Sequence, residues 1–218
     1  MSVGSALSAG RPRLLVATRS AHKLAELRDL LGLDPAELVS LDDLGVEGDV
    51  DETGSTFEAN ARLKARHGAR LTGLATLADD SGLEVDALGG GPGVRTRRYA
   101  GENATDLENN AKLLAALDGL PTQRRAARYV CVLALALPDR TGPRGGLDVR
   151  TVRGTCRGRI ALASRGTGGF GYDPIFEPAS EPPGGRTLGE WSQAAKNEIS
   201  HRGAAARRMQ PILHDLGF

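Results

Sequence analysis

Short apolar runs and amphipathic segments alternate along the chain, which predicts strands and helices that follow one another. Residues 13–18 contain a continuous apolar run, as expected for a short buried strand. Leucines at helical spacing then form one stripe of residues 20–32. Ser20 is placed to cap this helix and Gly32 to end it.

The remaining pattern predicts three more helices, at residues 55–71, 104–117 and 200–216. Capping boxes are expected where Ser55 precedes Glu58 and where Thr187 precedes Glu190. Further strands are predicted at residues 37–41, 74–79, 83–87, 127–137, 147–155 and 159–163. The second and third of these flank a sharp Asp-Ser-Gly turn, and a basic stretch links the last two. Because strands and helices interleave, the predicted fold class is α/β, with a mixed central sheet flanked by helices.

No linker divides the chain, and residues 178–186 are rich in proline and glycine, as in a surface loop. The first ten residues lack the basic and apolar regions of a signal peptide. We therefore predict a disordered lead-in at residues 1–12 and a single domain at residues 13–218. This domain is expected to form two lobes around a substrate cleft.

Composition narrows the class of protein. The 218 residues carry a net charge of +1, from 28 basic and 27 acidic side chains, which argues against a duplex-DNA-binding or membrane-surface protein. No apolar run reaches the ~18 residues needed to cross a bilayer. Cys131 and Cys156 are the two cysteines, so a disulfide framework is excluded and a reducing, cytoplasmic location is favoured.

The turn from Thr18 to Lys23 is the first candidate site. It joins a strand to a helix, where free backbone N–H groups and the positive helix end favour an anion such as phosphate. Four of the 28 basic residues are lysines, and Lys23, Lys64 and Lys196 all fall in candidate motifs. The turn is not a Walker P-loop, and an ordinary well-capped helix explains it equally well.

Asp79 and Asp80 form the second candidate, because adjacent carboxylates at the end of an apolar strand are costly without a metal or a proton to move. Side chains alternate along a strand, so one of the two suffices to face a cleft. Asp80, on the turn side, is the candidate for binding Mg²⁺ or activating water. An Asx-type turn is the alternative explanation.

The third candidate is the glycine-rich segment 165–174. It matches G-x-G-x-x-G, but Pro174 and Pro178 follow closely, so it does not open the helix that a dinucleotide site needs. Glycines around Phe170 instead suggest a backbone pressed against a flat ligand, with the ring as a stacking platform. The alternative is a tight hairpin with Phe170 in the core.

A basic helix start is the fourth candidate, because Lys196, His201 and Arg202 lie at the end of a helix that disfavours positive charge. These side chains are suited to donate to ligand oxygens, although a solvated basic turn has the same composition. Two weaker elements are the carboxylate of Glu52 and the pair Asn60 and Lys64, which share one helical face.

These blocks, in this order, resemble the inosine/xanthosine triphosphate pyrophosphatase family over about residues 13–217. The matching positions are Ala17-Thr18, Lys23, Glu52-Thr53-Gly54, Asn60-Ala61, Lys64-Ala65, Ala78-Asp79-Asp80-Ser81-Gly82, Gly91-Pro92-Gly93-Val94, Arg98-Tyr99, Gly169-Phe170-Gly171-Tyr172-Asp173-Pro174 and Ser200-His201-Arg202. The resemblance implies an α/β homodimer that needs Mg²⁺ and hydrolyses ITP, dITP or XTP to the monophosphate and pyrophosphate.

The resemblance also implies roles for individual residues. The triphosphate would be held by Thr18, Arg19, Ser20, Ala21, His22 and Lys23, with Lys64 assisting. The base pocket would consist of Phe170, Gly171, Tyr172, Asp173, Lys196, His201 and Arg202. Glu52 and Asp80 would bind the metal, Asp80 would also be the general base, and Ser81 would touch the substrate. The chain departs from the family at Ser20, usually Asn, and at Arg19, often Gly.

The residues support this chemistry independently. Lysines and Mg²⁺ suit a triphosphate. Donors such as Arg202 would donate to the O6 of hypoxanthine or xanthine and would leave the N6 donor of adenine unpaired. Two alternatives stay open: a dTTP/UTP-type pyrophosphatase, and a nucleotide-binding module without turnover. The block from Gly169 to Asp173 argues against the first, and the carboxylates Asp79, Asp80 and Glu52 against the second.

Overall fold

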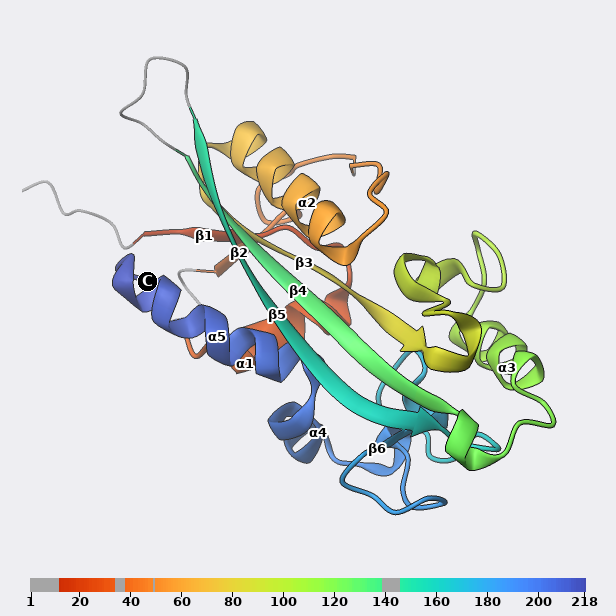
Figure 1. The fold of residues 1–218 in the computed structure, drawn as a ribbon. Coiled ribbons are helices and arrows are strands. Elements are labelled where there is room, and N and C mark those ends of the chain that lie inside the picture. Colours follow the sequence, from red (N-terminus) through yellow and green to blue (C-terminus); the bar gives the residue numbers. More distant parts are fainter. Residues whose placement is uncertain (1–11, 34–37, 49, 139–145) are drawn as a thin grey trace, which may run out of the picture.

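The computed structural model describes residues 12–33, 38–48, 50–138 and 146–218. Its centre is a six-stranded sheet with the order β2-β1-β3-β4-β5-β6 (Figure 1). The strands are β1 Leu14–Val16, β2 Leu38–Ser40, β3 Ala75–Val85, β4 Ala126–Pro138, β5 Leu147–Ile160 and β6 Phe176–Pro178. β1 pairs in parallel with β2 and β3, and the other pairs are antiparallel, so the predicted mixed sheet is confirmed.

Helices cover both faces of this sheet. They are α1 Ala21–Leu31, α2 Phe57–Thr72, α3 Asp106–Ala116, α4 Gln193–Ile199 and α5 His201–Asp215. Alternate residues of β4 separate the faces, because Cys131 and Leu133 pack with α1 and α5 while Val130 and Val132 pack with α2. The flanking helices of the predicted α/β fold are therefore confirmed.

The long strands β3, β4 and β5 run between two ends of the molecule (Figure 1). One end carries α1, α2 and α5, and the other carries α3 and β6. A separate hydrophobic cluster fills the second end, where Leu113 of α3 and Leu117, just after it, pack with Tyr129 and Phe176. These two ends agree with the expected lobes, while the substrate cleft and the single domain stay predictions.

Two predicted breaks in the sheet are wrong. β3 runs through the expected Asp-Ser-Gly turn, with Asp80 paired to Val132 of β4 and Gly82 to Val130. Gly82 serves close packing here, because a Cβ would lie 2.7 Å from the carbonyl oxygen of Gly93. β5 likewise continues through the basic stretch between residues 155 and 159, where it pairs with both β4 and β6. Partner strands on the neighbouring edges override these local turn signals.

Most helix ends lie where the sequence places them. Gly32 ends α1 in the left-handed conformation, Ser200 caps α5, and Thr187 forms its capping box with Glu190. α2 differs, because its cap is Thr56 rather than Ser55, and α4 was not predicted. The predicted lead-in falls almost entirely outside the described residues. Within them, no helix is both long and apolar enough to cross a membrane.

Candidate functional site

The candidate residues gather where β1 ends and the chain turns into α1. β1 pairs with β3 as far as Val16 opposite Leu77, and the two adjacent carboxylates of β3 follow just beyond. Thr18 Oγ1 accepts a hydrogen bond from Ser20 N at 3.2 Å, and Ser20 Oγ accepts one from Lys23 N at 3.4 Å. The remaining first-turn amides have no acceptor within the helix, so this edge can bind an anion. In open α/β sheets, ligands bind at this kind of strand end.

Asp79 and Asp80 are consecutive in β3, so their side chains leave opposite faces of the sheet. Asp79 is buried on the face of α1 and α5, with its Oδ2 atom 3.1 Å from Lys23 Nζ and 3.3 Å from Arg202 Nη2. Burial alone would raise the pKa of Asp79, but Lys23 and Arg202 outweigh it and hold the pKa well below its ordinary value. Asp79 is therefore a fixed anion between two helices.

Asp80 lies on the other face, beside α2. Lys64 Nζ is 3.1 Å from Asp80 Oδ1 and 3.1 Å from Glu52 Oε1, so one ammonium group joins the two carboxylates. Burial raises the pKa of Asp80 above its ordinary value in spite of Lys64. The second oxygen, Oδ2, is buried and has no hydrogen-bond partner among the described residues. It is thus open to a cation or a water molecule.

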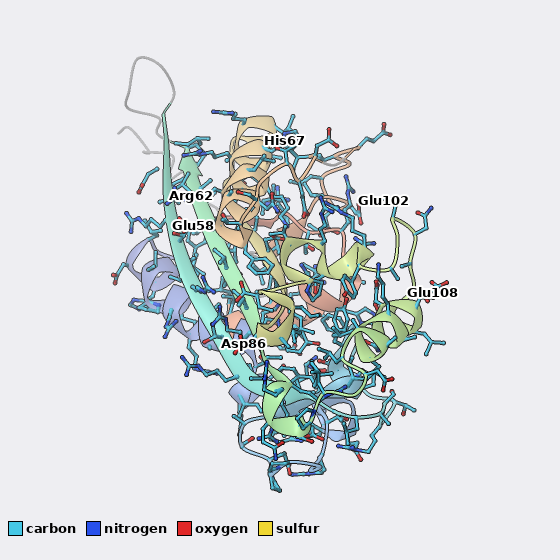
Figure 2. The ribbon with its side chains drawn as sticks, turned by 45° about the vertical axis from the view of Figure 1, so that its right-hand side comes forward. Glu58, Arg62, His67, Asp86, Glu102 and Glu108 are labelled. Atoms are coloured by element: carbon cyan, nitrogen blue, oxygen red, sulfur yellow. The ribbon has the colours of Figure 1, made fainter. Side chains whose placement is uncertain are left out.

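α2 presents two different sides. Glu58 and Arg62 pair at 2.9 Å on one side, and both are labelled in Figure 2. Asn60 and Lys64 lie on the other side, as their spacing predicts. Asn60 Oδ1 accepts a hydrogen bond from Gly54 N at 2.7 Å, and a Cβ on Gly54 would lie 2.5 Å from that oxygen. This contact fixes the segment before Gly54, which carries the second carboxylate of the pair.

Glu26 of α1 is a site residue that the sequence analysis missed. Its buried carboxylate accepts from Lys196 Nζ at 3.0 Å and from Arg202 Nη1. Burial alone would raise the pKa of Glu26, but Arg202 and Lys196 outweigh it and lower the pKa. The available signal was a charged residue beside Leu27, at the border of the apolar stripe of the helix.

A series of charges, buried except for the half-buried Lys23, alternates in sign from one part of the site to the other. In order of contact they are Lys23, Asp79, Arg202, Glu26, Lys196 and Asp173. The first belongs to the first turn of α1 and the last to the glycine-rich loop. Because a buried charge is stable only when it is paired, each member depends on its neighbours. The ion pairs therefore join the anion-binding turn to the loop.

Phe170 lies at the meeting point of these elements. The His22 ring stacks on it at a centroid distance of 5.3 Å, and Lys196 Nζ lies 4.5 Å from its centroid. Asp173 Oδ2 accepts hydrogen bonds from Phe170 N at 3.0 Å and Lys196 Nζ at 2.8 Å. Gly169 has φ +73°, and a Cβ there would lie 2.1 Å from Asp173 Oδ2. The loop is thus built around Asp173, and Phe170 is half-buried and outside the hydrophobic clusters of the described residues.

Three residues that the resemblance assigns to base binding make contacts within the protein, and two of them, Tyr172 and His201, are buried. Tyr172 is buried in the core, and its hydroxyl donates to the carbonyl oxygen of Thr96 at 2.7 Å. His201 is buried and stacks on Tyr129 at 4.7 Å, and burial lowers its pKa well below the ordinary value. Gly171 N donates to a carboxylate of α3 at 2.7 Å. In this structure these three residues hold the loop and the sheet in place.

Some of the other predicted residues lie in the site, and others lie outside it. Arg202 Nη2 donates to Ser81 Oγ at 3.0 Å, while its buried Nε has no partner among the described residues. Ala21 and His22 are exposed on the first turn of α1. Arg19 turns away from the strand end and bonds to the segment after β2.

The charge balance of the cluster bears on metal binding. Lys23, Lys64, Lys196 and Arg202 face five carboxylates, from Glu26, Glu52, Asp79, Asp80 and Asp173. One excess negative charge disfavours an anionic ligand unless a cation accompanies it. Glu52 and Asp80 fit Mg²⁺, which is commonly bound by one or two carboxylates together with substrate phosphates. No group of three or more His, Cys, Asp and Glu side chains within the described ranges is arranged to hold a metal ion.

Comparison with known proteins finds relatives that match most of the length of the chain. A dITP/XTP pyrophosphatase of Anaeromyxobacter sp. (strain Fw109-5) is 47% identical, over 93% of this chain and 97% of the relative. A dITP/XTP pyrophosphatase of Nocardia farcinica is 48% identical, over 92% and 94%.

Solved structures agree with the sequence relatives. A HAM1 protein from Coxiella burnetii superposes with a TM-score of 0.81 at 41% identity, covering 94% of this chain and 99% of that one. A nucleoside-triphosphatase, dITP/XTP pyrophosphatase, from Mycobacterium abscessus gives 0.71 at 45% identity, covering 91% and 99%. The profile of the Ham1 family matches residues 14–212, which confirms the resemblance found in the sequence. The chain belongs to the Ham1 family.

Proposed function

We propose that this protein is a Mg²⁺-dependent pyrophosphatase that hydrolyses non-standard purine nucleoside triphosphates, ITP, dITP and XTP, to the monophosphate and pyrophosphate. The relatives named dITP/XTP pyrophosphatase support this substrate class. The observation that carries the reaction is the pairing of Asp80 and Glu52 around Lys64, beside the helix start that suits a phosphate.

The triphosphate binds along the edge beyond β1. The turn from Thr18 to Lys23 supplies hydroxyl groups and the amides of the first turn of α1, and Lys64 reaches the same edge from α2. Ser20 is shorter than the asparagine usual in the family, so its contact with a phosphate oxygen runs through a water molecule. Glu52 and Asp80 hold Mg²⁺, which neutralises negative charge on the phosphates when it is bound.

Asp80 is the general base. Its buried Oδ2 atom has no partner among the described residues and can accept a proton, and burial raises its pKa, which strengthens it as a base. Asp80 takes a proton from the water that attacks the α-phosphorus, and the P–O bond to the pyrophosphate leaving group breaks. Asp79 does not share this role, because Lys23 and Arg202 hold its pKa well below the ordinary value and make it a weak base.

The purine stacks on Phe170, whose loop is fixed by Asp173 and Lys196. Discrimination comes from donors at the O6 edge, where the unpartnered Nε of Arg202 is suited to hypoxanthine and xanthine but not to adenine. Because Arg202 already donates to the carboxylates of Glu26 and Asp79 and to Ser81 Oγ, its position is fixed before the base arrives.

The test is the release of pyrophosphate from ITP, XTP, dTTP and ATP with Mg²⁺ and with excess chelator. Pyrophosphate from ITP and XTP, dependent on the metal, supports the proposal. Preference for dTTP would replace it with the dTTP/UTP-type activity, and tight ITP binding without turnover would replace it with a binding module.

We also propose that the enzyme is a cytoplasmic homodimer, as the resemblance implies for the dimer, and that it binds neither nucleic acid nor membrane. The near-neutral net charge of +1 supports the absence of nucleic-acid and membrane partners. The two buried, unpaired cysteines Cys131 and Cys156 support a reducing compartment such as the cytoplasm. A molar mass of about twice 22.9 kDa by light scattering tests the dimer, and a mass of one chain would contradict it.

A further inference from the structure

The guanidinium of Arg19 donates hydrogen bonds to three acceptors in a neighbouring segment of the chain. Its Nη2 atom donates to the carbonyl oxygens of Val46 at 2.6 Å and Gly48 at 2.5 Å, and its Nη1 atom donates to Asp42 Oδ1. All three acceptors lie in the segment of residues 41–48, which follows β2. The side chain of Arg19 thus spans from the turn before α1 to this segment.

The segment of residues 41–48 is itself an ordered series of turns. Val46 N donates to the carbonyl oxygen of Leu41 at 3.0 Å, and Gly45 N donates to that of Asp42 at 3.0 Å. Leu44 and Val46 pack against the apolar cluster under β1 and β2. Arg19 donates to carbonyl oxygens of this segment, those of Val46 and Gly48.

The segment of residues 41–48 comes shortly before Glu52 in the chain, so its contacts with Arg19 bear on the position of Glu52. Gly48 lies four positions before Glu52, which shares Lys64 with Asp80. Gly54, two positions after Glu52, is held by α2. Glu52 therefore lies between two held positions, Gly48, which Arg19 contacts, and Gly54, which Asn60 of α2 contacts.

From this geometry, and resting on the proposed function, we propose that Arg19 is a positioning residue. It braces the 41–48 segment against the phosphate-binding turn, so that Glu52 is held at the distance from Asp80 that a divalent cation requires. Arg19 does not contact the triphosphate, because its guanidinium is already bound to three acceptors. A planar fork is needed for this arrangement, and a lysine replaces only part of it.

The first test does not depend on activity. A glutamate-specific protease cleaves after Glu47 within the braced segment, and cleavage after Glu102, in an exposed loop labelled in Figure 2, serves as the internal reference. In Arg19→Ala the rate of cleavage after Glu47, relative to that after Glu102, should rise about tenfold. This is the scale expected for the loss of at least one net hydrogen bond. Arg19→Lys should give an intermediate rate.

Arg28→Ala is the matched control. Arg28 lies on α1 and pairs with Asp43 of the same segment at 3.8 Å, but without directed bonds to its carbonyl oxygens. This variant should leave the rate after Glu47 within about twofold of that of the parent protein, as expected for an exposed ion pair. Adding Asp42→Ala to Arg19→Ala should not change the rate of cleavage after Glu47 further, because Arg19→Ala has already removed the contact between Arg19 and Asp42.

The second test separates the brace from a phosphate contact. The brace predicts that Arg19→Ala raises the Mg²⁺ concentration for half-maximal ITP hydrolysis about tenfold, with a near-normal KM at saturating Mg²⁺. A raised KM with unchanged cleavage after Glu47 would show instead that Arg19 binds phosphate, and the proposal would be wrong. If the parent protein hydrolyses no triphosphate, the proposed function fails, while unchanged protease cleavage alone would already overturn the brace.

Discussion

Two neighbouring carboxylates acquire opposite properties from their surroundings. Asp79 faces Lys23 and Arg202 and is held as an anion, whereas burial raises the pKa of Asp80, whose Oδ2 atom has no partner among the described residues. The alternation of side chains along a strand was enough to expect that the pair would separate. The sequence could not show which helix each one faces, because that depends on the packing of α2 and α5 against the sheet.

Asp80→Asn should reduce kcat for ITP by about 10²-fold or more, because the amide keeps the shape but loses the charge and the basicity. The free energy of unfolding should stay the same or rise slightly, since the change removes the one excess negative charge of the cluster. The measurement is steady-state kinetics together with urea unfolding.

Two other variants act as controls for this prediction. Asp86→Asn changes an exposed carboxylate just after β3, labelled in Figure 2, and should leave both kcat and stability unchanged. Asp79→Asn should destabilise the protein by about 3 kcal/mol, because Lys23 and Arg202 lose a buried partner. If Asp80→Asn retains activity within a few-fold of the parent enzyme, Asp80 is not the base.

At the scale of elements, α1 and the glycine-rich loop form one unit. α1 carries Lys23 toward Asp79 and Glu26 toward Lys196 and Arg202, and its first turn places His22 against Phe170. Strand and helix positions followed from periodicity and caps. The continuity of β3 and β5 did not, because partner strands decide whether a charged or glycine-containing stretch stays extended.

Glu26→Gln tests the buried ion pairs. At pH 7 the variant should unfold about 3 kcal/mol more easily, because Lys196 and Arg202 lose a charged partner. The folded protein lowers the pKa of Glu26 from 4.5, so its contribution is fully present above that pH and is lost as the pH falls through the folded value. Urea unfolding between pH 3 and 7 should show the two proteins converging at low pH. A difference that stays constant with pH would contradict this role.

Phe170→Ala tests the stacking platform. Binding of every purine triphosphate should weaken by ~1–3 kcal/mol, because stacking does not depend on the edge pattern of the base. The free energy of unfolding should change by less than ~0.5 kcal/mol, since Phe170 lies outside the core. Phe176→Ala, in the core of the same end of the molecule, is the control and should destabilise the fold by ~3–5 kcal/mol. Unchanged affinity with a destabilised fold in Phe170→Ala would favour the core interpretation.

At the scale of the whole molecule, the sheet brings distant segments to one edge. Residues 18–23, 52–64, 79–81, 169–173 and 196–202 meet there, from four helices, a strand and a loop, which no local pattern predicts. Motif order was sufficient to name the family, and packing then gave the site its alternating charges. The excess carboxylate of this cluster is the physical reason to expect that turnover needs a divalent cation.

The most direct measurement is hydrolysis of ITP with Mg²⁺ in ¹⁸O-labelled water, with mass analysis of the products. The account predicts IMP carrying one labelled oxygen, unlabelled pyrophosphate, and a kcat/KM for ITP at least ~10²-fold above that for ATP, because a site built for O6 leaves the adenine N6 donor unpaired. Labelled orthophosphate and IDP would instead place the attack at the terminal phosphorus. That result, or equal turnover of ATP, would contradict the account.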